Sequence, residues 1–202
     1  IAAMAAAGNL DNVTPAQVAA LPAATIDSVP PAVVAGLTDA QVAALTDAQL
    51  AALTDAQVAA LATAGKLDSL SSAQVAVLPA ATIDSVPPAV VAGLTDAQVA
   101  ALTPAQLAGL TDAQIAAMAA AGNLDNVTPA QLATLPAATI DSVPPAVVAT
   151  LTDEQVAALT DAQLSALTEA QKVAMVTAGN LDNLSAAQLL LLAPDNTAAV
   201  AA

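Results

Sequence analysis

LTDAQVAA LTDAQLAA LTDAQVAA, residues 37–60, is a run of three nearly identical eight-residue units. Each unit begins with Leu-Thr-Asp, carries Gln at its fifth position and has Val or Leu at its sixth. From Met4 to Leu192 the chain divides into units of this kind, and the first residue of every unit is Leu, Val or Met. The chain is therefore a repeat array, and the physical chemistry of the octet predicts its fold.

The residue after Thr indicates where each helix begins. It is Asp in most copies, such as Asp39, and Pro in others, at Pro15, Pro104 and Pro129. Asp and Pro share a preference for the first turn of a helix, whereas Pro inside a helix costs about 3 kcal/mol. Thr at the N-cap and Gln three residues later form a capping box. Each octet thus predicts one short helix of about five or six residues followed by a corner.

A single long helix does not fit this period. Eight residues of α-helix turn through about 800°, so the leading Leu would drift by about 80° per unit and form no stripe. We expect Leu and the residue at the sixth position to point inward together, as in the pairs Leu37–Val42, Leu45–Leu50 and Leu53–Val58. The small Ala residues between them allow close approach of neighbouring backbones. The predicted fold is an all-α solenoid of very short capped helices with an aliphatic core.

A second, longer period is superimposed on the octet. The segment LPAATIDSVPPAVVA begins at Leu21, Leu78 and Leu135, which are 57 residues apart. The predicted organisation is one continuous solenoid with a partial block at 1–20, repeat blocks at 21–77, 78–134 and 135–191, and a remnant at 192–202. Because the chain opens in mid-unit at Ile1, we expect it to be part of something longer.

Each 57-residue block contains one unit of nine residues, such as MAAAGNLDN at 4–12. Its glycine follows a run of Ala and predicts a left-handed C-cap. The Leu two residues later is expected to supply the accompanying apolar contact. These residues are Gly8, Gly65, Gly122 and Gly179, with Leu10, Leu67, Leu124 and Leu181. We expect the extra residue to reset the register once per block.

The composition excludes several classes of function. The net charge is −15, with Lys66 and Lys172 as the two basic residues, so a nucleic-acid interface or an anionic lipid surface is not expected. No Cys or His is present, which removes disulfides, thiolate chemistry and a Ser–His–Asp triad. Asp, Gln, Thr or Pro interrupts every octet, so no apolar run of about 18 residues is available for membrane insertion.

Three polar patterns are candidate sites. The Asp after Thr could form an acidic ladder for Ca²⁺, but compensation of the helix dipole explains it better, because Pro replaces it. The turns Asp11–Asn12, Asp68–Ser69, Asp125–Asn126 and Asp182–Asn183 could hold a weak metal site, but we expect them to bond their own backbone. The TIDS segments at 25–28, 82–85 and 139–142 contain no partner base. We predict no catalytic, cofactor-binding or metal-binding residues, no cofactor and no enzymatic activity.

Two features near the C-terminus depart from the repeat. Lys172 stands at the sixth position, where the other LTxxQ units have an aliphatic residue. Either this unit is frayed or partner-facing, with Val173 taking over the apolar role, or it is a drifted copy. The run Leu189–Leu192 puts bulky groups where Ala is usual. It is interpreted as the end of the array, which either caps the last coil or meets another chain.

The octets, including TPAQVAAL at 14–21 and LTPAQLAGL at 102–110, resemble the tandem octapeptide-type repeats of long bacterial cell-surface and secreted adhesin-like proteins. The resemblance covers most of the chain. It implies an extracellular or cell-surface stalk, fibre or spacer and supplies no catalytic residues. TAL-effector repeats also open with LTPxQV, but the block length, the missing base-reading loop and the acidic charge exclude that reading.

The leading functional hypothesis is an extracellular structural protein that forms or extends a filament by stacking and self-association. An uncapped end exposes apolar surface that another copy can cover, and a contact that does not close produces a fibre. The alternatives are a surface module that binds a ligand or a cation, and a designed consensus scaffold. The scarcity of Lys and the lack of Arg disfavour the designed scaffold.

Overall fold

The computed structural model describes residues 12–182 and 184–192. The described chain is built from short α-helices and 3₁₀ turns and contains no strand, so the predicted all-α class is confirmed. The α-helices are α2 (Pro15–Ala19), α3 (Pro31–Ala35), α4 (Asp39–Ala43), α5 (Asp47–Leu50), α6 (Asp55–Thr63), α7 (Ser72–Ala76), α8 (Pro88–Ala92), α9 (Asp96–Ala101), α10 (Pro104–Ala108), α11 (Asp112–Ala120), α12 (Pro129–Leu132), α13 (Pro145–Val148), α14 (Asp153–Ala157), α15 (Asp161–Ala166), α16 (Glu169–Ala178) and α17 (Ala186–Leu192). The 3₁₀ turns are η2 (Ala23–Thr25), η3 (Leu67–Ser69), η4 (Ala80–Ser85), η5 (Asn123–Asn126) and η6 (Ala137–Ser142).

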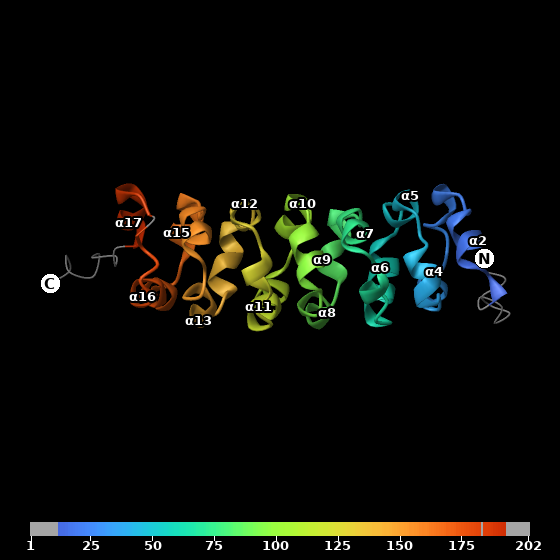
Figure 1. Ribbon diagram of the computed structural model, residues 1–202, viewed down its shortest axis with the longest axis horizontal. Helices are drawn as coiled ribbons and strands as arrows, with labels where there is room; N and C mark the ends of the chain where they lie inside the picture. Colours follow the sequence, from blue (N-terminus) through green and yellow to red (C-terminus); the bar gives the residue numbers. More distant parts are fainter. Residues whose placement is uncertain (1–11, 183, 193–202) are drawn as a thin grey trace.

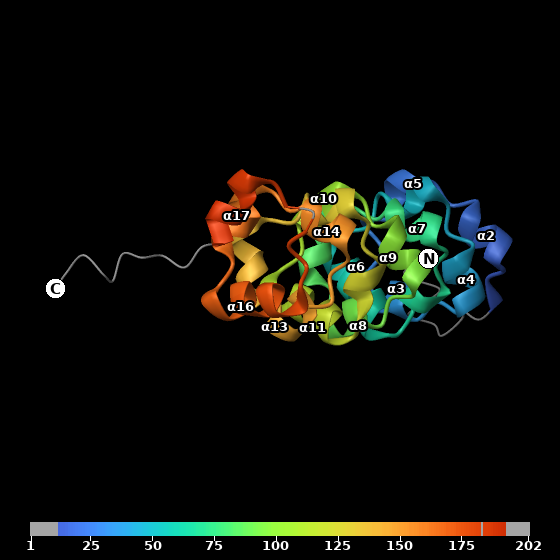
Figure 2. The same cartoon turned by 60° about the vertical axis from the view of Figure 1, so that its left-hand side comes forward.

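The helices form an elongated row in which α2 lies at one end and α17 at the other (Figure 1). In both views α8, α11, α13 and α16 lie along one side, while α5, α10 and α17 lie along the other (Figure 2). The packing partners agree with this arrangement: α3 packs on α6, α8 on α11 and α13 on α16. Each of these partners is separated in sequence by a stretch that runs round the other sides of the row.

Helix starts follow the predicted chemistry. At Thr38 the hydroxyl accepts from the Gln41 backbone N–H and the Gln41 side chain accepts from the Thr38 backbone N–H, which completes the capping box. The same box precedes α10, where Pro104 occupies the first helical turn. Because Asp and Pro both serve at this position, the Asp residues there belong to helix initiation.

Three helices continue beyond their octet. Helices α6 and α11 are nine residues long and α16 is ten residues long, because each runs from an LTxxQ unit into the nine-residue unit that follows. Each run stops at a left-handed glycine, with φ of +68° at Gly65, +81° at Gly122 and +80° at Gly179. Leu67 and Leu124 behind them are buried. The predicted glycine C-caps are confirmed, whereas Gly8 and Leu10 lie outside the described residues.

The core is a narrow column of aliphatic side chains. The residues at the first and sixth positions of the octets are buried along the row, including the predicted pairs Leu37–Val42, Leu45–Leu50 and Leu53–Val58. The exceptions are at the two ends of the described chain. Since no aromatic residue is present, the core consists of many small contacts distributed along the length.

At Lys172 the structure contradicts two parts of the first reading of this unit, namely that Val173 takes over the apolar role and that the unit is frayed. The side chain of Lys172 is buried, with 7% of the residue exposed, whereas Val173 is 62% exposed. Val173 therefore does not take over the apolar role. The unit is not frayed either, because Thr168 and Gln171 form a complete capping box for α16. Lys172 keeps the inward position of its octet and its Nζ reaches Glu169 Oε1 at 3.2 Å.

Candidate functional site

The most regular polar feature of the molecule is the glutamine at the fifth position of the octets. Gln106 is 1% exposed, and its Oε1 accepts the backbone N–H of Thr103 at 2.9 Å. Its Nε2 donates to the carbonyl oxygens of Val75 at 2.8 Å and Leu78 at 2.9 Å. One side chain thus caps its own helix and ties it to a distant part of the chain.

The same arrangement recurs along the whole row, and we name it the glutamine ladder. Each Nε2 donates to backbone carbonyl oxygens 28 to 31 residues earlier. The donors are Gln41, Gln49, Gln57, Gln74, Gln98, Gln106, Gln114, Gln131, Gln155, Gln163, Gln171 and Gln188.

The hydrogen bonds of the ladder give the number of residues between one part of the chain and the part that packs against it. Acceptors at the first position of an octet are 28 residues back in most cases, as for Gln106 and Leu78. They are 29 residues back where a nine-residue unit intervenes, as for Gln74 and Leu45. We call one such return a coil. A return of 28 residues and one of 29 together span the 57-residue repeat, so each sequence block corresponds to two coils.

Asparagine takes the place of glutamine in the nine-residue units. Asn180 Nδ2 donates to Ala149 O at 3.1 Å and Leu151 O at 3.0 Å, and Asn123 Nδ2 donates to Ala92 O at 2.8 Å. In the adjacent turn, Asn126 Nδ2 donates to Asp96 Oδ1 at 3.0 Å. The expectation that the polar turn side chains bond their own backbone is therefore wrong for Asn126, because its amide reaches the preceding coil. Asp11 and Asn183 lie outside the described residues.

The TIDS segments form 3₁₀ turns closed by their own hydroxyl groups. Thr82 Oγ1 donates to Pro79 O at 2.8 Å, and Ser85 Oγ donates to Thr82 O at 2.6 Å. The copy at 139–142 has the same two bonds. Since each hydroxyl hydrogen is committed to a backbone carbonyl, these residues act as turn-closing groups.

Two ion pairs involve the two lysines. Lys66 Nζ lies 2.7 Å from Asp39 Oδ1, across 27 residues of sequence. The hydrogen bond from Lys66 and then its positive charge lower the pKa of Asp39 below its ordinary value. The pair joins α4 to the turn η3, which packs against it.

Within residues 12–182 and 184–192, no cluster of three or more metal-ligating side chains is found.

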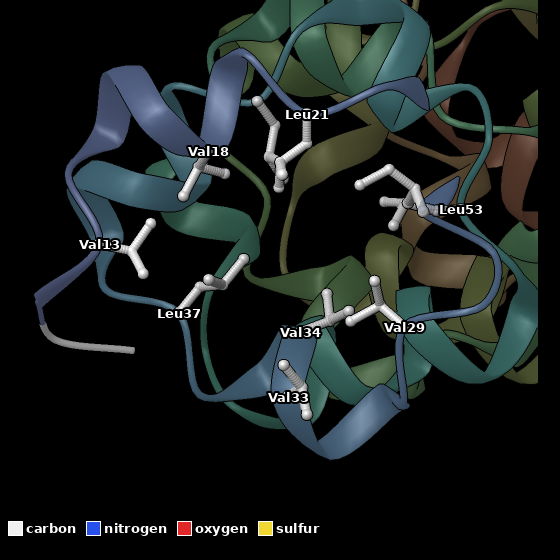
Figure 3. A pocket seen from close by; sticks show the side chains of 10 residues that line it. Val13, Val18, Leu21, Val29, Val33, Val34, Leu37 and Leu53 are labelled. Carbon is white, nitrogen blue, oxygen red and sulfur yellow. The ribbon is translucent and has the colours of Figure 1, made fainter. Parts of the chain in front are cut away.

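An apolar cavity of about 30 Å³ lies inside the row near α2 (Figure 3). Its lining comes from the first coils: Val13, Val18, Leu21, Ile26, Val29, Val33, Val34, Leu37, Leu45 and Leu53. A second cavity, of about 10 Å³, is lined by aliphatic residues from the segment that runs from Leu124 to Leu167. A void lined only by aliphatic groups offers water no hydrogen-bond partners and stays dry. Both cavities are packing voids of the column.

The end of the row near α2 exposes groups that are covered elsewhere. Val13, Leu21 and Val29 are half-buried, whereas their counterparts one block later, Leu70, Leu78 and Val86, are at most 4% exposed. We call these three residues, together with Gln17 and Thr25, the leading face.

Polar groups on the leading face show the same difference. Gln17 is exposed and makes its capping box, but among the described residues its Nε2 donates to no carbonyl of another coil. Thr25 is exposed as well, whereas Thr82 and Thr139 are 3% and 9% exposed. The leading face is therefore the part of the coil surface that a preceding coil covers elsewhere in the row.

The opposite end of the row exposes a second set of side chains, which we call the trailing face: Val173, Val176, Leu189 and Leu190. Val176 is 53% exposed, whereas its counterparts Ala119 and Ala62 are 3% and 1% exposed. Leu189 is 40% exposed, against 2% for Leu132 one block earlier. Leu190 is 75% exposed. The difference arises because η4 packs on α6 and η6 on α11, while no described element takes that place on α16.

Sequence reasoning assigned glutamine to helix capping and missed its second role. Glu can complete a capping box as readily as Gln. Yet in this strongly acidic chain the fifth position is Gln in every octet that has Thr or Ser at its second position. A carboxylate accepts hydrogen bonds but cannot donate them. The exclusive use of the amide was the signal that the position needs a donor as well as an acceptor.

Comparisons with protein-family models, with curated proteins and with solved structures found no match. None of the helices in the described part of the chain has both the length and the apolar character needed to cross a membrane.

Proposed function

We propose that this chain is a structural repeat protein, a solenoid of eight-residue units in a 57-residue super-repeat, that forms or extends a filament, fibre or stalk by stacking. The observation that carries the proposal is the exposure of Val176 and Leu189 on a surface whose earlier copies are buried by the next coil. Apolar side chains of this size favour being covered, by about 25 cal/mol per Å² of area removed from water.

The ladder supports a structural role. Its bonds connect each coil to the one before, so stability is distributed over the length and does not depend on a single centre. We also propose that the chain has no catalytic role. This rests on the absence of His and Cys and on the closure of the TIDS hydroxyls onto their own backbone. A location outside the cell is part of the proposal and rests on the resemblance of the octets to surface-protein repeats.

Light scattering and electron microscopy of the purified chain at neutral pH test the proposal. The expected result is a concentration-dependent rise in mass with elongated particles of constant width. A monodisperse monomer at every concentration up to the millimolar range would exclude a self-assembling filament.

A further inference from the structure

The nine-residue units differ from one another at a position that faces the preceding coil. Lys66 stands where the corresponding units of the next two blocks have Asn123 and Asn180. We propose that this exchange gives the row a built-in opening point at the end of α6, where an ion pair takes the place of a bond between coils. The opening point belongs to the single chain and does not depend on self-assembly.

In the second and third blocks this position carries a bond between coils. Asn123 Nδ2 donates to Ala92 O at 2.8 Å, and Asn180 Nδ2 donates to Ala149 O at 3.1 Å. The first bond ties the turn after α11 to the end of α8, and the second ties the turn after α16 to the end of α13. Each bond therefore closes one end of a packed helix pair, α8 with α11 and α13 with α16.

The first block lacks this bond. The equivalent acceptor is the carbonyl of Ala35 at the end of α3, and among the described residues no side chain donates to it. Lys66 directs its Nζ to Asp39 Oδ1 on α4 instead, at 2.7 Å. Ala35, Ala59 and Thr63 line a hollow between α3 and α6 that opens to solvent. The end of α3 is therefore held to α6 by packing alone, with water close to the free carbonyl.

The ion pair is a poor substitute for the missing bond, because it reaches α4 and not α3. Its side chains are also accessible to water, with 72% of Asp39 and 23% of Lys66 exposed. Exposed ion pairs contribute little to stability and are screened by salt. Of the two elements that pack on α4, η3 adds the exposed carboxylate of Asp68 and α2 has no charged residue. Opening at this junction should therefore be more frequent than at its counterparts, and sensitive to salt.

Amide hydrogen exchange followed by NMR measures the opening of each junction. The reporters in the first block are the N–H groups of Gly36, which donates to Ala32 O, and Ala64, which donates to Ala60 O. Their counterparts in the second block, Gly93 and Ala121, donate to Ala89 O and Ala117 O and serve as internal references.

Two reciprocal substitutions isolate the exchanged position. Lys66→Asn supplies the amide donor that the first block lacks. Asn123→Lys removes the donor from the second block and places an ammonium group opposite Asp96, the counterpart of Asp39. Each amide is compared with itself in the unmodified chain, so its distance from the end of the row does not affect the result. Circular dichroism establishes that both variants are folded.

We expect Lys66→Asn to slow exchange at Gly36 and Ala64 by about two- to tenfold, which corresponds to the net contribution of one neutral hydrogen bond. Exchange at Gly93 and Ala121 should stay unchanged in that variant. Asn123→Lys should accelerate exchange at Gly93 and Ala121 by a similar factor. Unchanged exchange at Gly36 and Ala64 in Lys66→Asn, or no acceleration in Asn123→Lys, would overturn the opening point.

Salt tests the part played by the ion pair. Raising NaCl from about 0.05 M to about 0.5 M shortens the screening length to a few ångströms. In the unmodified chain, the exchange rates of Gly36 and Ala64 should then rise relative to those of Gly93 and Ala121, and in Lys66→Asn this ratio should not change. The ratio removes the effect of salt on the repulsion within the whole acidic chain. A ratio independent of salt in the unmodified chain would show that the ion pair does not hold the junction.

Discussion

Replacing Gln106 by Leu tests the ladder where it is completely buried. The substitution keeps a side chain of similar size but removes both the acceptor for Thr103 N–H and the donor for Val75 and Leu78. The Val75 carbonyl still accepts from Leu78 N–H at 3.2 Å, whereas the Thr103 N–H and the Leu78 carbonyl lose their partner. Two backbone groups are therefore left unsatisfied in or near the core.

The size of the effect follows from these two groups. Each buried unsatisfied group costs about 1–3 kcal/mol, and the additional apolar burial of Leu offsets about 1 kcal/mol. We expect Gln106→Leu to lower the free energy of unfolding by about 1–5 kcal/mol. Gln17→Leu is the matched control, because Gln17 makes the same capping box in an exposed position where water replaces the lost bonds. Its expected cost is below about 1 kcal/mol.

Urea unfolding followed by circular dichroism at 222 nm is the suitable assay, since the chain has no aromatic fluorophore. Unchanged m-values for both variants are required, because a change would indicate a loss of cooperativity along the repeat array. Equal midpoints for the Gln106 and Gln17 variants would refute the reasoning. It would mean that the glutamines serve only as helix caps and that the bonds between coils contribute nothing.

Three further experiments probe the ladder, the Lys66–Asp39 ion pair and the glycine positions. Gln106→Glu keeps the cap acceptor but puts a carboxylate against two carbonyl oxygens, which raises the pKa of the new carboxyl above its unfolded value near 4.3. The penalty relative to the unmodified chain should thus be small at pH 4 and grow as the pH rises to 7, and a penalty independent of pH would contradict it. Lys66→Met removes the ammonium group that lowers the pKa of Asp39. In the unmodified chain the ion pair stabilises the fold above the unfolded pKa of Asp39, and this stabilisation is lost as the pH falls through the folded pKa, so it should be absent from Lys66→Met. Carboxyl ¹³C titration should show that the pKa of Asp39 rises in Lys66→Met and is unchanged in Lys172→Met. Gly93→Ala should stabilise the folded chain by about 0.4–1 kcal/mol, because Gly93 has φ −87° and a Cβ there meets nothing closer than 3.5 Å. Gly122→Ala should destabilise it by about 1–2 kcal/mol, because Gly122 has φ +81°. Thermal unfolding measures both changes.

Local structure was predictable because it depends on neighbours in sequence. Thr38 and Gln41 are three residues apart, and the exchange of Asp for Pro at the next position marks a helix start without any tertiary information. The glycine caps and the inward pairs such as Leu53–Val58 follow from the same short-range logic. Longer helices such as α6 were missed because the octet corner is absent where the nine-residue unit begins.

The contacts between coils were not predictable from the octet. The residues that contact each other between successive coils depend on how far the chain turns between one octet and the next. Because all octets carry nearly the same side chains, the sequence does not show how large this turn is. The acceptors of Gln57, at Ile26 and Val29, became known only from the folded chain. Lys172 shows a second limit: its inward position persists despite its charge, because the packing of its octet determines which side chain points inward.

The most direct test of the central claim, that the chain is a stack in which each 57-residue block forms two coils, is to delete one whole block and measure the shape and the folding of the product. Removal of residues 78–134 joins Val77 to Leu135, which recreates the native junction between Val77 and Leu78 and keeps every ladder glutamine in register. Removal of residues 78–130 deletes four residues fewer and leaves a partial octet.

Small-angle X-ray scattering with circular dichroism gives both quantities on each product. We predict that the block deletion retains the helix content per residue and a cooperative transition, and shortens the longest dimension without changing the cross-section, while the out-of-register deletion loses helix content or cooperativity. If the two deletions behave alike, or if the block deletion changes the cross-section, the two-coil repeat is wrong.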